Sequence, residues 1–173
     1  EKVLAHILFI APLFEQANQT RHHITRSAIN AYHQSIQSIV FDHYGTGDSH
    51  GELIDTNLAL WQQDILLQLK EIKAQSSHAI YLSLPLSAVL LLSDEMLSLI
   101  DGITLLQPDF NGKRFVKHFK RIALAAGLTE VNKPKNTSED EDRIVEIAGY
   151  VMKSNLLDEL AGQTINKLTD FNI

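Results

Sequence analysis

The segment Ser83-Leu84-Pro85-Leu86-Ser87 holds the residues whose types and spacing come nearest to covalent chemistry. It follows an apolar run typical of a strand and precedes a helical pattern, and a serine on such a turn can act as a nucleophile. The central residue is Pro85, whose saturated ring has no lone pair with which to attack. We expect the flanking hydroxyls of Ser83 and Ser87 to make structural hydrogen bonds or helix caps instead.

Eight histidines raise the question of a metal ion or a general base. His43 and His50 flank a glycine-rich segment together with Asp42 and Asp48, which is the most polar cluster expected near a strand end. No His-x-x-x-His or Glu-x-x-His spacing is present to hold a metal. The sequence therefore predicts polar loop residues here, and neither a metal nor a cofactor.

Two other groups of charges could hold a ligand or a partner. Glu15 and Arg21 bracket the approach to the first helix, and we expect them to pair with each other in preference to binding a polar ligand. A later helical pattern combines four cations with two phenylalanines: Lys113, Lys117, Lys120, Arg121, Phe115 and Phe119. An acidic partner is one interpretation of this pattern, but a solvated face over a buried aromatic stripe is the more frequent one.

Apolar runs and helical periodicities alternate along the first 110 residues. The expected strands are Val3–Ile10, Ser38–Asp42, His78–Ser83 and Gly102–Gln107. Helices are expected from about Asn18 to Gln37, from Thr56 or Asn57 through the apolar stripe Leu58, Trp61, Ile65, Leu69 and Ile72, and over Leu86–Leu99. This alternation predicts a three-layer α/β fold with a mostly parallel, doubly wound sheet and right-handed crossovers.

The character of the sequence changes after Pro108. Here we expect a helix over Lys113–Ala126, a mobile loop over Val131–Asp142 and a mainly helical segment over Arg143–Leu168. The prediction is a single domain over residues 1–173, with a βα core at 1–110 and a mainly helical cap or packing region at 111–173.

Composition narrows the classes of function. The net charge of −6 and a pI near 5.7 argue against general binding to nucleic acid or anionic membrane. The lack of cysteine excludes disulfides, thiolate nucleophiles, zinc ribbons and iron–sulfur clusters, and it favours a cytoplasmic location. No apolar run approaches the ~18 to 20 residues that a membrane span requires.

Two segments resemble a known family. Ala11–Arg21 is similar to the segment after the third strand of the α/β-hydrolases associated with exosortase systems, especially their second type. Asp42–Gly51 resembles the Asp-x-x-Gly-x-Gly-x-Ser loop after the fourth strand across the α/β-hydrolase superfamily. Shorter matches at Leu106-Gln107-Pro108, Gly112–Phe115 and Ala148–Tyr150 extend the resemblance over roughly residues 5 to 165.

The resemblance implies a truncated hydrolase core from a bacterium, with its strands in the spatial order second, first, third, fourth. A ligand crevice is then expected beyond the carboxyl ends of the first and third strands, lined by Leu13, Phe14, Glu15, Asn18, Arg21, Leu84, Pro85 and Leu86. In the superfamily the nucleophile is the centre of Gly-x-Ser-x-Gly, so Pro85 is expected at the apex of the turn. The acid and the histidine of that family follow strands beyond the fourth, which this chain is expected to lack.

These observations predict a degenerate hydrolase-fold protein, a pseudoenzyme that binds a small acyl or polar ligand or has an accessory role in exosortase-linked surface export. The alternative is an ester or thioester hydrolase in which Ser83 or Ser87 attacks and His43 or His50 acts as base. Backbone amides near Leu13 would then stabilise the oxyanion. We also expect the free edge of the fourth strand to be covered by the carboxy-terminal helices or by a second copy in a homodimer.

Overall fold

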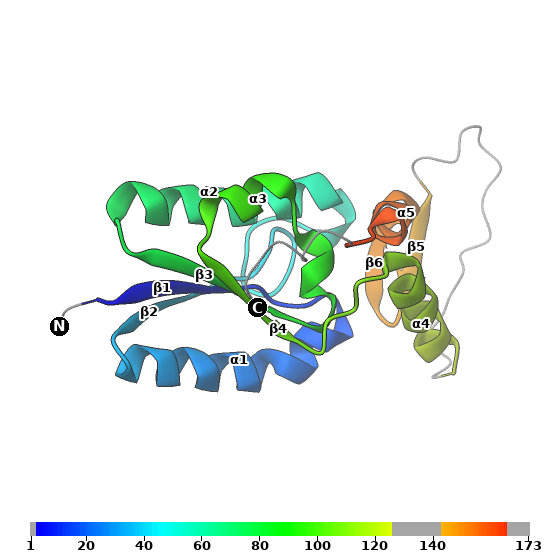
Figure 1. Cartoon of the computed structure of the whole chain (residues 1–173). Coiled ribbons are helices and arrows are strands. Elements are labelled where there is room, and N and C mark those ends of the chain that lie inside the picture. The colour runs from blue at the N-terminus through cyan, green and yellow to red at the C-terminus, as the bar shows by residue number, and fades with distance from the viewer. Residues whose placement is uncertain (1–2, 126–142, 166–173) are drawn as a thin grey trace.

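Four parallel strands form the centre of the molecule (Figure 1). The computed structural model describes residues 3–125 and 143–165. The strands are β1 (Ala5–Phe9), β2 (Ile36–Val40), β3 (Ala79–Pro85) and β4 (Gly102–Leu106). They pair in the order β2-β1-β3-β4, which confirms the predicted sheet.

Helices cover both faces of this sheet, which makes the fold three-layered. In Figure 1, α1 (Glu15–His33) lies below the sheet, and α2 (Leu58–Gln75) and α3 (Asp94–Leu99) lie above it. The apolar stripe predicted for α2 is buried at every position, from Leu58 to Ile72. The side chain of Asn57 caps α2 by accepting a hydrogen bond from the Leu60 amide at 2.8 Å.

Two helix boundaries differ from the prediction. α1 begins at Glu15, three residues before Asn18, directly after Phe14, which has φ 54° and makes no side-chain cap. Glu15, which was expected before the helix, therefore belongs to its first turn. The helix expected over Leu86–Leu99 is two elements, the 3₁₀ helix η2 (Leu86–Leu91) and then α3, whose cap is Ser93.

The prediction of a mainly helical segment after Arg143 is wrong for its first half. β5 (Ile144–Ile147) and β6 (Tyr150–Lys153) form an antiparallel hairpin, and only α5 (Ser154–Gly162) is helical. The two turn residues Ala148 and Gly149 both have positive φ, at 55° and 82°, as the commonest two-residue hairpin turn requires. The loop expected over Val131–Asp142 lies outside the described residues.

The hairpin, α5 and α4 (Gly112–Ala125) gather at the carboxyl end of the strands (Figure 1). α4 and α5 pack on each other there and do not lie along the free edge of β4. The expected cover of that edge by the carboxy-terminal helices is therefore wrong for these two helices, and cover by a second copy stays a prediction. Phe115 and Phe119 are buried and the four cations of the basic stripe are exposed, which confirms that the aromatic stripe lies in the core; whether the cations meet a partner stays a prediction.

One histidine is buried in the sheet without a hydrogen bond. His6, in β1, is only 6% exposed, and neither of its ring nitrogens has a partner within the described ranges. Burial lowers the pKa of His6, and the neighbouring ring of His78, 6.2 Å away between centroids, lowers it further. The folded protein therefore resists protonation of this ring more than the unfolded chain does.

We expect His6 to make the protein less stable in acid. Below a pH of about 6.5 the unfolded chain binds a proton that the folded ring takes up only at lower pH, so the free energy of unfolding falls as the pH falls. Urea unfolding of the wild type and of His6→Leu at pH 7.5 and at pH 5 would measure this. The variant should lose less stability across the interval, and equal losses would show that His6 is not the cause.

Candidate functional site

The turn after β3 carries its backbone strain at Leu86. Leu86 has φ 51°, in the left-handed region that leucine rarely adopts, whereas Pro85 is extended at φ −78° and ψ 142°. The predicted apex at Pro85 is therefore wrong by one residue. The reason is local, since the pyrrolidine ring holds φ near about −65° and excludes proline from a positive-φ apex. Pro85 instead ends β3, paired with Leu106.

Ser87, the residue after the apex, is closed into a hydrogen-bond network with Gln16. Ser87 is fully buried, and its Oγ donates to Gln16 Oε1 at 2.6 Å while its amide donates to the same oxygen at 3.2 Å. The Leu13 amide donates to Ser87 Oγ at 2.9 Å. If Leu86 were a nucleophile, the amide of Ser87 and one from the loop after β1 would bind its oxyanion. In this structure Gln16 already accepts the hydrogen bond of the Ser87 amide, and the Ser87 hydroxyl accepts that of the Leu13 amide.

Gln16 is a site residue that sequence reasoning missed. It is the second residue of α1. Its side-chain oxygen accepts hydrogen bonds from Ser87, in the turn after β3 and 71 residues later in the sequence. No local motif marks such a contact. The available signal was the resemblance of Ala11–Arg21 to the segment after a hydrolase strand, which contains this position.

Phe14 is the second strained residue and joins the sheet to the elements at its carboxyl end. Its ring is buried and stacks on Phe119 of α4, with centroids 4.5 Å apart and planes 11° apart. It also meets Trp61 of α2 and Tyr150 of β6 edge to face. The loop after β1 is therefore held between the sheet and the region formed by α4, α5 and the hairpin.

A cavity of about 670 Å³ lies beyond the carboxyl ends of β1 and β2. Such a volume is within the range of small-molecule sites. The hairpin tip at residues 149–151 forms part of its wall. Four of the residues expected to line a crevice do line this cavity: Leu13, Phe14, Asn18 and Arg21.

The rest of the expected crevice lies elsewhere. Pro85 and Leu86 line a smaller cavity of about 370 Å³ between α1 and β4, together with Ser83. Leu84 is buried in the hydrophobic core, and Glu15 is exposed. The structure thus divides the residues predicted around one switch point between two cavities and the core.

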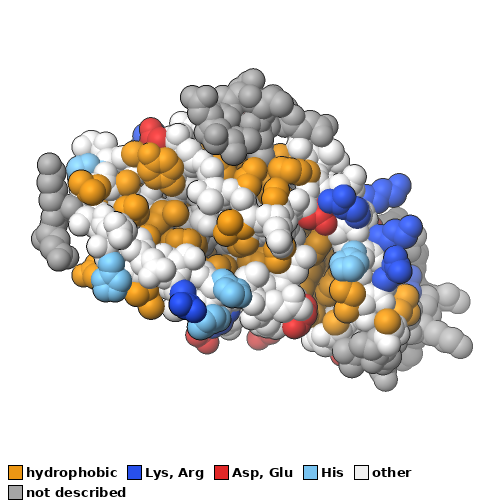
Figure 2. Space-filling model, turned by 60° about the horizontal axis from the view of Figure 1, so that its bottom comes forward, with side chains coloured by type: hydrophobic (Ala, Val, Ile, Leu, Met, Phe, Trp, Pro, Cys, Tyr) orange, Lys and Arg blue, Asp and Glu red, His pale blue; other side chains and the backbone are white. Residues whose placement is uncertain are grey.

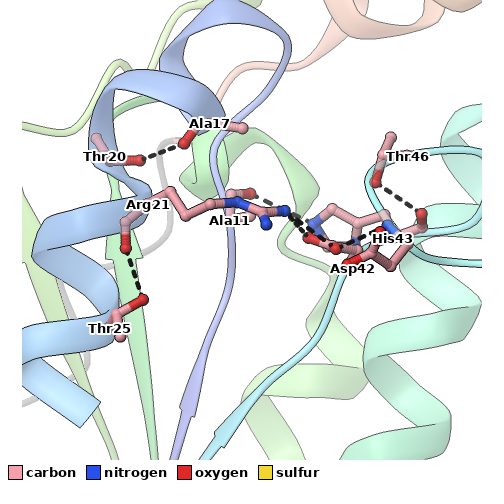
Figure 3. Close-up of polar contacts among 9 residues, drawn as sticks. Ala11, Ala17, Thr20, Arg21, Thr25, Asp42, His43 and Thr46 are labelled. Atoms are coloured by element: carbon pink, nitrogen blue, oxygen red, sulfur yellow. Dashed lines mark hydrogen bonds and ion pairs between the residues drawn. The ribbon is translucent and has the colours of Figure 1, made fainter. Parts of the chain in front are cut away.

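An ion pair stands at the polar side of the larger cavity (Figure 3). Arg21 Nη2 lies 3.1 Å from each carboxylate oxygen of Asp42, and the Asp48 amide donates to Asp42 Oδ2 at 3.0 Å. The predicted pairing of Arg21 with Glu15 is therefore wrong. β2 delivers Asp42 to this edge of the sheet, whereas Glu15 lies near the hairpin tip.

Tyr150 connects the hairpin tip to α1. Asn18 Nδ2 donates to the Tyr150 hydroxyl oxygen at 3.2 Å and to Glu15 Oε2 at 3.3 Å. Burial raises the pKa of Tyr150, and the Glu15 carboxylate raises it further. The tyrosine is therefore neutral at physiological pH. Its hydrogen bond to Asn18 joins the hairpin tip to α1 without adding a charge to the cavity wall.

His43 lines the cavity but is not arranged as a general base for either serine. It is 2% exposed, and its Nε2 donates to the Ala11 carbonyl at 3.3 Å. Burial lowers the pKa of His43, against the opposing effects of this hydrogen bond and of Asp64 and Asp42. His50 is exposed and does not line this cavity. Within the described ranges, no three His, Asp or Glu side chains are placed to hold a metal ion.

The glycine loop between Asp42 and Gly51 is held by its own backbone. The Gly45 amide donates to the His50 carbonyl at 2.9 Å, and the Thr46 amide donates to the His43 carbonyl at 2.9 Å. Gly47 has φ 53°, and a Cβ at this position would lie 2.2 Å from Asp42 Oδ2. The loop therefore needs glycine at this position to bring Asp42 to Arg21.

Comparison with known proteins identifies the fold. No family model and no curated protein matches the sequence. The structure is similar to a solved chain from work on the metagenome-derived lipolytic enzymes LipS and LipT, with a TM-score of 0.57 and 13% identity. The match covers 92% of this chain and 63% of that one, so this chain spans under two thirds of its neighbour's length. The fold is therefore α/β-hydrolase-like, with leucine at the strained turn after β3.

None of the described helices is both long and apolar enough to cross a bilayer.

Gly47→Ala should destabilise the protein by about 2 kcal/mol or more, because it adds a strained φ to a clash with the Asp42 carboxylate. Gly162→Ala is the matched control, since a Cβ there meets no atom within 4 Å. It should be neutral or slightly stabilising, because alanine favours helix over glycine. Thermal and urea unfolding of both variants would measure the difference. Equal stabilities for the two variants would contradict the role assigned to Gly47.

Proposed function

We propose that this domain is a degenerate hydrolase-fold protein that binds a small ligand in the 670 Å³ cavity without hydrolysing it. The observation that carries the proposal is the network behind the strained turn. Leu86 offers no lone pair for attack, and the neighbouring amides of Ser87 and Leu13 already donate within the protein. A substrate carbonyl would have to displace Gln16 to reach these donors.

The cavity supports a ligand with an apolar body and a polar end. Its wall includes Ile24, Phe41 and Trp61, while Arg21 and Asp42 lie at its polar side. Molecules with an acyl chain or an aromatic ring and a hydrogen-bonding head suit this division. The structural likeness to a lipolytic enzyme supports the same class of ligand. In this proposal α4, α5 and the hairpin act as a cap over the carboxyl end of the sheet.

A place in an exosortase-linked export system is the finer part of the proposal. It rests on the sequence resemblance of Ala11–Arg21 and Asp42–Gly51 alone. The absence of cysteine favours a reducing compartment such as the cytosol for this role.

The rival function is an ester or thioester hydrolase that uses Ser83 or Ser87. Ser83 is 3% exposed and Ser87 is fully buried, and no histidine within residues 3–125 and 143–165 is hydrogen-bonded to either. The Ser87 hydroxyl would also have to break its hydrogen bond to Gln16 before it could attack a substrate.

Incubation with p-nitrophenyl butyrate separates the two functions. We expect no release of nitrophenol above the buffer rate, because no hydroxyl stands at the apex. Turnover that disappears in Ser87→Ala or Ser83→Ala, each checked for folding by circular dichroism, would establish the rival and end the proposal.

Binding is tested by thermal unfolding with a series of acyl and aryl carboxylates and alcohols. A ligand at 100 times its dissociation constant should stabilise the fold by about 2.7 kcal/mol. Ala17→Phe, which fills the cavity from α1, should abolish the effect, whereas Ala59→Phe on the exposed side of α2 should preserve it. Failure of the whole series to stabilise the wild type, or equal stabilisation of Ala17→Phe, would contradict binding in this cavity.

A further inference from the structure

α4 concentrates positive charge on an acidic chain. Its 14 residues include Lys113, Arg114, Lys117, Lys120 and Arg121 and no Asp or Glu, although the whole chain has a net charge of −6. The net charge alone therefore misrepresents the field that a partner would meet at this end of the molecule.

The packing of α4 against the core determines which side of the helix faces solvent. α4 buries Phe115, Val116 and Phe119 against the rest of the protein, so the opposite side of the helix must face outward. All five cations are exposed. Figure 2 shows blue Lys and Arg side chains gathered at the right-hand end of the molecule, next to hydrophobic ones.

Among the described residues, one of these five cations forms an ion pair with a carboxylate. Arg114 pairs with Asp109 at 2.7 Å. Lys113, Lys117, Lys120 and Arg121 make no salt bridge within the parts of the chain that the structure describes. At physiological salt, charges beyond about 8 Å are largely screened, so a partner at this face meets mainly the charges of α4 and of its near neighbours.

An exposed aliphatic side chain lies on the same side of α4 as the cations. Leu124, in the last turn of the helix, is 63% exposed, and the 100° spacing of helical residues places it beside Lys117, Lys120 and Arg121. An acidic protein surface would satisfy the cations but would need matching apolar contacts of its own. A lipid–water interface accepts both kinds of side chain together, with cations at the headgroups and aliphatic groups at the acyl boundary.

We propose that the outward face of α4, made by Lys113, Lys117, Lys120, Arg121 and Leu124, docks the protein on an anionic lipid surface. The occupant is a membrane leaflet or vesicle rich in acidic phospholipid. Attraction of this kind weakens roughly fivefold for each cation removed near the surface. The inference does not depend on the proposed ligand, because none of these five residues lines the large cavity.

Co-sedimentation with phosphatidylcholine vesicles, with and without phosphatidylserine, tests the proposal. The wild type should bind the phosphatidylserine vesicles at physiological salt and be released by about 1 M salt. Lys117→Glu/Arg121→Glu should bind on the order of a hundredfold more weakly. The matched control Arg26→Glu/Lys73→Glu makes the same change in net charge on exposed positions of α1 and α2 and should stay within a few-fold of the wild type.

Leu124→Ser separates a lipid surface from an acidic protein, because it leaves the charge unchanged. Vesicle binding that falls several-fold supports lipid docking, and unchanged binding overturns it. Absence of wild-type binding to phosphatidylserine vesicles also overturns the proposal, as does an equal loss in the control pair. Binding to soluble polyglutamate but not to vesicles would replace the lipid with an acidic protein partner.

Discussion

The architecture of the site depends on one constraint, the sharp change of direction where β3 ends and η2 begins. Leu86 accepts a left-handed backbone there, and that conformation places the Ser87 amide and hydroxyl inward. Both groups are buried, so each needs an acceptor, and a single oxygen of Gln16 serves both. The donors at this turn, where a hydrolase would present its reactive group to a substrate, are therefore occupied by hydrogen bonds within the protein.

A second strained residue, Phe14, faces the same region from the loop after β1. Its ring joins α2, α4 and the hairpin through Trp61, Phe119 and Tyr150. The two strained residues therefore act together: one closes the turn after β3, and the other holds the carboxy-terminal elements above it. The cavity of about 670 Å³ lies toward β2, where Arg21 and Asp42 meet, and the cavity of about 370 Å³ lies on the β4 side of the turn.

The periodic parts of the fold were predictable from the sequence, and the long-range contacts were not. The stripe from Leu58 to Ile72 and the four apolar runs predicted α2 and the four strands, because burial determines such patterns, whereas the order of the strands came from the family resemblance. The hairpin after Arg143 was missed because its signal is the Ala148-Gly149 turn, which is short and lies between residues that also suit a helix. The apex at Leu86 could have been deduced from Pro85, since proline excludes a positive φ. The partners of Arg21 and Ser87 depend on tertiary distances that no local spacing encodes.

The central claim is that the donors beside the strained turn are already occupied. Amide hydrogen exchange of Leu13 and Ser87, followed by NMR in the wild type and in Gln16→Ala, tests it most directly. The account predicts slow exchange at both amides in the wild type and exchange of the Ser87 amide that is at least about tenfold faster in the variant, since loss of the acceptor exposes this donor. Fast exchange at both amides in the wild type, unaltered by the substitution, would show that the donors are open and would contradict the account.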